Sequence, residues 1–359
     1  MMSKNAKILS HCFFILAAMI FIMIGLGAVT RLTKSGLSIV EWNLLSGTLP
    51  PLNLQDWEKL FSLYQKSPEY QKINFGMSLE DFKNIFWLEY IHRLWGRIMG
   101  LFTLYPLLLT ALRLKRHFLK VLLVFTLGGI QGAIGWYMVK SGLISDPMVS
   151  PYRLALHLMF GFMTFGFCLW FGLVTKYPAA PPIDFKHQRF LIGLLGLCMV
   201  TVIYGGIVAG HKAGLIYNTF PKMGGAWIPA EIFDLTPLWK NFIENHATIQ
   251  LTHRFLAYSL FLGIWYWGLK EYKRTNSGNF KKCIVGVMSA VTLQLCLGVA
   301  TLLNNVPTGL ATCHQLGGLI TFAMLLIALF YGRTSTQQSL DAGEHLTFQE
   351  LQESPASGG

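Results

Sequence analysis

The sequence predicts an all-α polytopic membrane protein, and composition and hydropathy carry this prediction. Of the 359 residues, 53% are hydrophobic and only 13% are charged, whereas a soluble domain carries about 25% charged residues. Apolar stretches long enough to cross a bilayer, about 20 residues each, recur along the chain and are separated by proline and glycine clusters or charge runs. We see no alternating segments of about 10 residues, the pattern of a membrane β-barrel.

Eight apolar stretches are expected to be transmembrane helices. The first, 10–30, follows two lysines, but no small-x-small cleavage site follows it, so we expect an uncleaved helix rather than a signal peptide. The remaining seven are expected at 84–112, 119–139, 152–175, 189–210, 247–269, 283–303 and 309–332.

The net charge of +12 is distributed as in a membrane protein rather than a nucleic-acid-binding protein. With eight spans, about half of the 29 Lys and Arg residues fall in the tail and short loops of one side. Short basic loops mark the cytoplasmic face, so we expect both termini to be cytoplasmic. No transit segment rich in Arg and Ser is visible, which favours a bacterial inner membrane.

The chain reads as two copies of one unit. "EYIHRLWGRIMGL" in the second span matches "QLTHRFLAYSLFL" in the sixth, "QGAIG" in the third matches "QLCLG" in the seventh, and "KSGL" after the first matches "KAGL" after the fifth. Four spans per half give a parallel repeat and two pseudo-symmetric four-helix bundles. We expect an N-terminal half at 1–180, a C-terminal half at 181–335 and a disordered tail at 336–359.

Four histidines fall at one depth of this predicted structure: His92, His157, His253 and His314. Each lies near the external start of an even-numbered span. An intramembrane polar group usually faces the bundle interior, and two facing imidazoles can bind a haem iron from its two sides. A zinc site needs three or four ligands of His, Cys or carboxylate type, whereas each half offers only two histidines, with Glu89 as a third candidate in the first half. A simple hydrogen bond to a neighbouring helix is the alternative for one histidine, but it does not explain four in register.

An arginine follows the first histidine of each half, at Arg93 and Arg254. Haem carries two propionates, and arginine pairs with carboxylates in bidentate fashion. Contact with these propionates and contact with lipid headgroups remain open as alternatives. The glycines at 128, 129, 132 and 135 form a small-residue stripe on the third span, for which we expect close helix packing. Room for a flat macrocycle is the second possibility.

The two halves differ at one ionisable position. Glu89 lies three residues before His92, on the same helix face, and Gln250 takes its place before His253. An ionisable group at membrane depth indicates function. We therefore infer that the first half performs proton-coupled chemistry and the second holds a resident cofactor. The alternative is that Glu89 is a solvated residue at a helix start.

An ordered set of segments extends over nearly all of residues 20–332. These are "GAVTRLTKSGLSIVEWNLLSGTLPP", "EYIHRLWGR", "GWYMVKSGL", "VSPYRLALH", "AGLIYNTFPKM", "THR" and "CHQ". Together they resemble the haem A synthase family, in the form typical of alphaproteobacteria and mitochondria. The resemblance implies oxidation of the C8 methyl of haem O to a formyl group, by two hydroxylations and loss of water, for cytochrome c oxidase.

The resemblance also implies roles for residues of this chain. It makes His253 and His314 the ligands of a haem b cofactor, assigns His92 and His157 to the substrate haem, and makes Glu89 the acidic residue tied to activity. The implied partners are haem O, the lipid membrane, an electron acceptor that the sequence does not identify and a haem O synthase. An oligomer is compatible with the sequence, and no nucleic acid is expected.

Two rival interpretations remain at this point. A di-haem cytochrome b that only carries electrons explains the four histidines but not the difference between Glu89 and Gln250. A transporter built on parallel repeats explains the duplication but not four histidines at one depth.

Overall fold

Each of the eight predicted stretches forms a long helix. The computed structural model describes residues 3–43, 46–179 and 183–353, and their side chains except at 46, 186, 187 and 334–353. Within these residues the chain has no β-strand. The long helices are α1 (Lys4–Leu32), α4 (Leu79–Arg113), α5 (Phe118–Gly142), α6 (Pro151–Lys176), α7 (Phe185–Gly210), α9 (His246–Arg274), α10 (Gly278–Leu303) and α11 (Thr308–Glu353).

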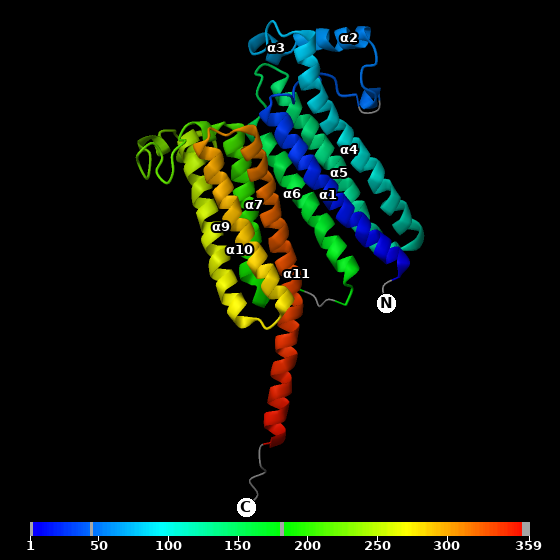
Figure 1. Cartoon of the computed structure of the whole chain (residues 1–359), viewed down its shortest axis with the longest axis vertical. Coiled ribbons are helices and arrows are strands. Elements are labelled where there is room, and N and C mark those ends of the chain that lie inside the picture. The colour runs from blue at the N-terminus through cyan, green and yellow to red at the C-terminus, as the bar shows by residue number, and fades with distance from the viewer. Residues whose placement is uncertain (1–2, 44–45, 180–182, 354–359) are drawn as a thin grey trace, which may run out of the picture.

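Seven of these helices, within the described residues, are long and apolar enough to cross a membrane. The exception is α9, which has 29 residues but carries Gln250, His253 and Arg254 among its apolar side chains. In Figure 1, α9 lies beside α10 and extends over a similar height of the bundle. The chain is therefore a multi-pass membrane protein, and the eighth span stays a prediction.

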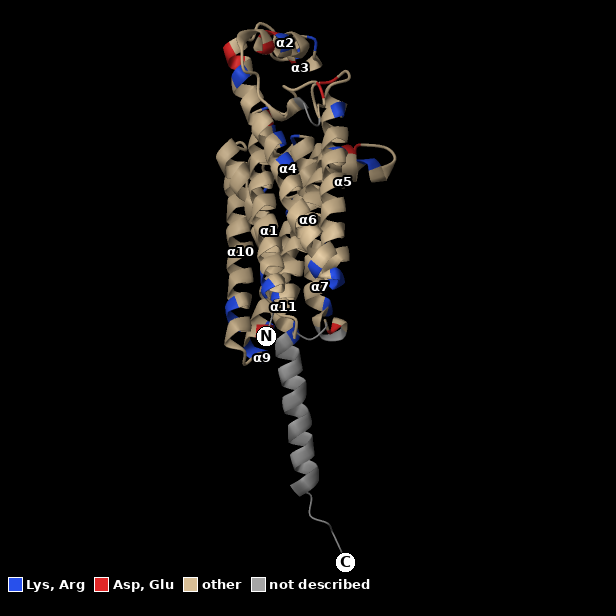
Figure 2. Cartoon of the chain, turned by 90° about the vertical axis from the view of Figure 1, so that its right-hand side faces the viewer, with Lys and Arg blue, Asp and Glu red and all other residues tan. Residues whose placement is uncertain are grey.

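The long helices stand roughly side by side, with the N-terminus at one end of the bundle and α2 (Leu54–Gln65) and α3 (Pro68–Lys72) at the other (Figure 1). We call the second end the loop end. Figure 2 shows Lys, Arg, Asp and Glu mainly near the two ends, with few charges between them. This is the charge distribution of a protein whose middle lies in hydrocarbon.

The two halves share one hydrophobic core. Its buried side chains come from α1, α5, α6, α7, α9, α10 and α11, and include Phe13, Phe162, Ile264 and Leu319. The rings of Phe162 and Phe322 bring α6 and α11 together, with centroids 6.0 Å apart. A methyl group built on Gly206 of α7 would lie 2.8 Å from the Cα atom of Ala155 in α6. Small residues therefore allow the halves to pack closely.

The loop end carries a second, smaller core. Trp57 and Tyr64 of α2 pack against Phe82, Phe86 and Tyr90 of α4, because α4 begins well outside the apolar part of its own sequence. Asn53 caps α2 by accepting a hydrogen bond from the N–H of Asp56, at 2.9 Å. The short 3-10 helix η1 (Ser46–Thr48) precedes this segment.

Shorter elements make up the other connections. The 3-10 helix η2 (Lys115–His117) joins α4 to α5. The 211–245 connection holds η3 (Ala213–Leu215), η4 (Ala230–Phe233), η5 (Leu238–Lys240) and α8 (Asn241–Glu244). Residues 180–182, in the connection between α6 and α7, lie outside the described residues.

The backbone of residues 336–353 is helical, as the continuation of α11, and the disorder expected for the 336–359 tail stays a prediction. A helix that already exists extends without a new nucleation step, and no proline interrupts α11 between Thr308 and Glu353. Residues 354–359 lie outside the described part of the chain.

Candidate functional site

In the N-terminal half, each predicted histidine lies against a glycine of the preceding long helix. A methyl group on Gly27 of α1 would lie 3.1 Å from Nε2 of His92 on α4. A methyl group on Gly135 of α5 would lie 3.0 Å from Cε1 of His157 on α6. Each imidazole therefore occupies space that any other residue at the glycine position would fill.

The same arrangement recurs in the C-terminal half. A methyl group on Gly205 of α7 would lie 3.3 Å from Cε1 of His253 on α9, and one on Gly298 of α10 would lie 2.8 Å from Cε1 of His314 on α11. The four glycines fix where the four rings can lie, because a carbon atom closer than about 3.5 Å is repelled.

The histidines come together in two pairs. His92 is close enough to His157 to interact with it electrostatically, and His253 interacts with His314 in the same way. Nδ1 of His157 is buried and has no hydrogen-bond partner among the described residues, whereas the rings of His253 and His314 lie near the backbone of Thr201 and Gln294. A buried nitrogen without a partner is costly and needs an explanation.

The two imidazoles of each half are a donor set that could hold a haem iron. The described residues contain no group of three or more His, Cys, Asp or Glu placed to hold a metal ion, as a structural zinc site would need. A glycine beside each ring lets the imidazole pack directly against the neighbouring helix. The donor set of two histidines in each half therefore fits haem better than a free metal ion.

A glutamine also recurs in both halves. The Nε2 atom of Gln131 on α5 donates to the backbone oxygen of His157 at 2.9 Å. Gln294 on α10 lies against Gly317 and Gly318 of α11. The Oε1 atoms of both glutamines are buried without a hydrogen-bond partner among the described residues. These side chains connect α5 to α6 and α10 to α11 close to His157 and His314.

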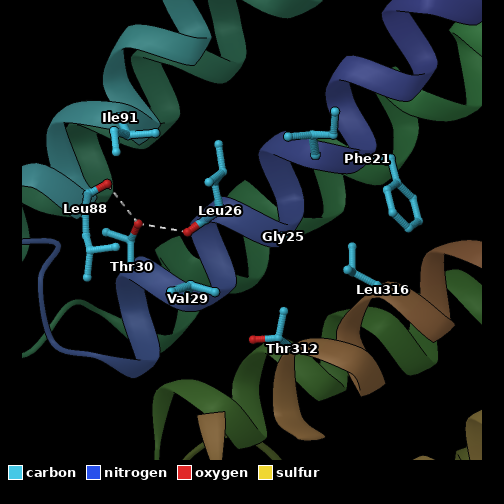
Figure 3. A pocket seen from close by; sticks show the side chains of 10 residues that line it. Phe21, Gly25, Leu26, Val29, Thr30, Leu88, Ile91, Thr312 and Leu316 are labelled. Carbon is cyan, nitrogen blue, oxygen red and sulfur yellow. Dashed lines mark hydrogen bonds between the residues drawn. The ribbon is translucent and has the colours of Figure 1, made fainter. Parts of the chain in front are cut away.

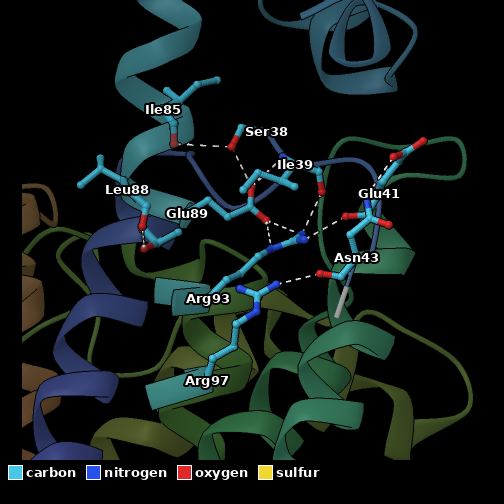
Figure 4. A network of polar contacts seen from close by, with 10 residues as sticks. Ser38, Ile39, Glu41, Asn43, Ile85, Leu88, Glu89, Arg93 and Arg97 are labelled. Carbon is cyan, nitrogen blue, oxygen red and sulfur yellow. Dashed lines mark hydrogen bonds and ion pairs between the residues drawn. The ribbon is translucent and has the colours of Figure 1, made fainter. Parts of the chain in front are cut away.

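Glu89 is the centre of a buried polar network (Figure 4). Its side chain is 3% exposed. Oε2 accepts hydrogen bonds from the Ser38 hydroxyl at 2.7 Å and from the Ile39 N–H at 2.9 Å. Oε1 accepts from Nε and Nη2 of Arg93, at 3.0 and 2.7 Å. The four donors use the four lone-pair positions of a carboxylate.

The alternative of a solvated residue at a helix start is therefore wrong for Glu89. The residue lies ten positions after Leu79, where α4 begins. The 38–43 segment covers it, because Arg93 also donates to the backbone oxygens of Ile39 and Glu41, at 2.8 and 3.1 Å.

Gln250 and Arg254 form the corresponding network of the second half. Gln250 is also 3% exposed, and its Oε1 accepts from Nη2 of Arg254 at 2.9 Å. Arg254 donates to the backbone oxygens of Tyr217 and Thr219, both at 3.0 Å. Each arginine thus fastens the loop of its own half over the histidine level. Most of their N–H groups bind protein oxygens in this structure.

The two loops present opposite groups to position 89 and position 250. The first loop offers Glu89 two donors, Ser38 and Ile39, whereas the second offers Gln250 an acceptor, because Gln250 Nε2 donates to the Ala213 oxygen at 2.8 Å. Both loops begin alike, with Lys34 and Lys212 at φ values of 55° and 54°. The loop of the first half is therefore matched to a carboxylate at position 89, and the loop of the second half is matched to an amide at position 250.

Comparison with known proteins places the chain in a family. The family described as "Cytochrome oxidase assembly protein" matches residues 10–326. The chain belongs to this family. Similar proteins include "Heme A synthase" of Nitrosospira multiformis, 43% identical over 87% of this chain and 90% of its own length. "Heme A synthase COX15" of Arabidopsis thaliana is 40% identical over 87% of this chain and 71% of its own length. "Heme A synthase" of Wolbachia pipientis is 39% identical over 92% and 95%.

For this member of the cytochrome oxidase assembly family, the predicted glycine stripe is mostly wrong. Gly128, Gly129 and Gly132 have no atom within 4 Å of a built methyl group, so they do not mark close helix packing. Only Gly135 of the stripe makes a close contact, with His157. Sequence analysis missed Gly27 and Gly205, although the "KSGL" and "KAGL" repeat aligns these two glycines with each other.

Sequence analysis also missed Glu69, a buried carboxyl group of α3 at the loop end. It is 3% exposed, and its Oε2 accepts from the hydroxyl of Tyr64 at 3.1 Å. Burial raises the pKa of Glu69 to about 7, and Glu89 adds to the rise while the Tyr64 hydrogen bond opposes it. No local sequence pattern predicts the burial of Glu69, because this residue lies in a polar segment.

Proposed function

We propose that the chain is a haem A synthase, a membrane oxidoreductase that converts haem O to haem A. The observation that carries the proposal is the pairing of four histidines in two halves of which one alone has a buried carboxylate, Glu89. The names of the relatives support the same reaction. Haem O becomes haem A when a methyl carbon is oxidised to a formyl group.

The resident cofactor in this proposal is haem b, held in the C-terminal half by His253 and His314. Haem b, when bound, supplies one-electron redox chemistry that side chains cannot provide. Gly205 and Gly298 let the imidazoles of His253 and His314 pack directly against the neighbouring helices. Gln250 carries no charge, which suits a site that holds a cofactor rather than one that moves protons.

The substrate, haem O, is held in the N-terminal half by His92 and His157. With water as the oxygen source, each hydroxylation replaces a C–H bond of the methyl carbon with a C–O bond and releases two protons, while two electrons go to the electron acceptor. A nearby proton acceptor therefore assists the reaction. Glu89 is a buried carboxylate of this half, one helical turn from His92. We assign it this catalytic role. Arg93 holds it in place through the paired hydrogen bonds to Oε1.

The network around Glu89 also indicates which oxygen takes the proton. Oε1 is bound by a guanidinium, which has no acceptor to offer in return. Oε2 is bound by the Ser38 hydroxyl, which can rotate and accept instead of donating. A proton on Oε2 can therefore be shared with Ser38 without breaking the ion pair with Arg93.

The rest of the proposal concerns location and partners. The protein spans a bacterial inner membrane with α9 as its eighth span. Both termini are on the cytoplasmic side, and the loop end faces outward. The short basic connections at the end opposite the loop end support this orientation. A haem O synthase that supplies the substrate is the proposed partner, and an electron acceptor completes the reaction.

Replacement of Glu89 with Ala tests the proposal, with Gln250→Ala as the matched control in the other half. Each variant is expressed in cells that make haem O, and the haems extracted from the purified protein are separated by chromatography. We expect Glu89→Ala to keep haem b and to lose haem A and its hydroxylated precursors. Gln250→Ala should still produce haem A. A normal yield of haem A from Glu89→Ala would contradict the catalytic role.

A further inference from the structure

A cavity of ≈ 300 Å³ lies between the two halves. Helices α1 and α4 form one wall, and α11 forms the other (Figure 3). All but two of the residues around it are aliphatic, aromatic or glycine. Gly25 contributes no side chain to its wall, and a methyl group there would stop 3.5 Å from Leu316. The cavity is large enough for a hydrocarbon chain and offers such a chain an apolar lining.

The cavity lies at the depth of both histidine pairs. Gly25 is two residues from Gly27, which touches His92, and Ile91 precedes His92 directly. On the opposite wall, Thr312 lies two residues before His314. The cavity is therefore next to the proposed substrate site but outside its four-helix bundle, on the side that faces the other half.

One wall carries an unsatisfied hydroxyl group. Thr30 donates its hydroxyl to the backbone oxygen of Leu26 at 2.8 Å. The Thr312 hydroxyl oxygen, in contrast, is buried and has no hydrogen-bond partner among the described residues. A buried hydroxyl without a partner is costly. A ligand with both a hydrocarbon chain and a polar atom at its start would satisfy this wall.

The cavity also reaches the outer surface of the bundle. Ile22 and Ile91 line it and are 45% and 44% exposed, which in a membrane protein means contact with lipid. A chain attached to a molecule at His92 could therefore enter sideways, from the membrane, without crossing the loop end.

We propose that this cavity holds the isoprenoid chain of haem O while its macrocycle lies between His92 and His157. The assignment rests on the proposed function and adds the means of substrate selection. Haem O differs from haem b by this chain and by the hydroxyl group at its base. A cavity that binds the chain makes the first half select haem O and leaves haem b to the second half.

Filling the cavity tests the assignment. Gly25→Leu places a branched side chain in it, and Gly25→Ala is the matched control, since its single methyl meets Leu316 at ordinary contact distance. Binding of haem O and of haem b to protein freed of substrate is measured by optical titration. We expect Gly25→Leu to weaken haem O binding about tenfold or more, since each methylene displaced from apolar contact costs roughly fourfold in affinity. Haem b binding at the same site should change less than about twofold.

Leu316→Phe fills the cavity from the opposite wall and keeps the test valid if Gly25→Leu does not fold. Thr312→Val should weaken haem O binding and leave haem b binding unchanged. Equal losses for both haems, or no loss of haem O binding, would overturn the assignment. A further outcome is that Gly25→Leu loses a co-purified lipid and still binds haem O normally. This result would overturn the assignment and indicate that the cavity holds a lipid acyl chain. If the wild-type protein itself neither binds nor converts haem O, the proposed function fails as well.

Discussion

Replacement of the glycine beside a histidine by alanine should release haem from one half only. Gly298→Ala is the most severe case, because its methyl carbon would lie 2.8 Å from Cε1 of His314. Two carbon atoms rest at about 3.5 Å or more, so the ring has to move by roughly 0.7 Å. Overpacking of this kind costs about 1–3 kcal/mol, which corresponds to a loss of haem b affinity of roughly ten- to a hundredfold.

The comparison variants follow from the same distances. Gly135→Ala, at 3.0 Å from His157, should impair the substrate haem and leave haem b in place. Gly205→Ala, at 3.3 Å from His253, should have a smaller effect than Gly298→Ala. Gly132→Ala is the control, because no atom lies within 4 Å of its methyl group.

The assay is the haem b content of each purified variant together with its low-spin electron paramagnetic resonance signal, which reports the orientation of the two axial imidazoles. A shifted signal in Gly205→Ala and a lost or weakened one in Gly298→Ala are the expected results. Full haem b content and an unchanged signal in Gly298→Ala, indistinguishable from Gly132→Ala, would refute the role of the glycines.

Three further predictions concern the polar networks. Glu89→Gln should destabilise the protein by about 1–3 kcal/mol, because the amide NH2 group must point either toward the Ile39 N–H or toward Arg93, and both of these only donate. Equal thermal unfolding of variant and wild type would contradict this. The folded-state pKa of Glu69 is raised above 4.5 to about 7. The stability that this carboxyl group contributes in its protonated form is therefore present below pH 4.5. It is lost as pH rises through 7, by up to about 3 kcal/mol. Proteolysis of the 53–78 segment should therefore accelerate between pH 5 and pH 8 in the wild type but not in Glu69→Gln, and an identical pH profile would count against it. Arg254→Ala should free the loop that it fastens, seen as faster hydrogen exchange at 217–221, and unchanged exchange there would show that other contacts hold this loop.

The sequence predicts the helices well, because each one is announced by a local apolar run. All eight expected stretches lie within the observed long helices. The pairing of the histidines could also be predicted, since the repeat and the direction of each span place His92 level with His157 and His253 level with His314.

Contacts between distant segments could not be predicted in this way. The burial of Glu89 depends on Ser38 and Ile39, about fifty residues away, whose loop folds back over α4. The shared core of the two halves and the cavity beside Gly25 likewise depend on how α1 meets α11. Local hydropathy reports which residues are apolar, but not which of two neighbouring helices they face.

The central claim is that one half binds a substrate haem for oxidation and the other a resident haem b. The most direct test is chromatography of the haems extracted from the wild-type protein, purified from cells that also make haem O. We expect haem b together with haem O, its hydroxylated forms or haem A. Haem b alone, at two per chain, would contradict the claim and indicate a di-haem electron carrier, and a protein without haem would remove the role of the four histidines altogether.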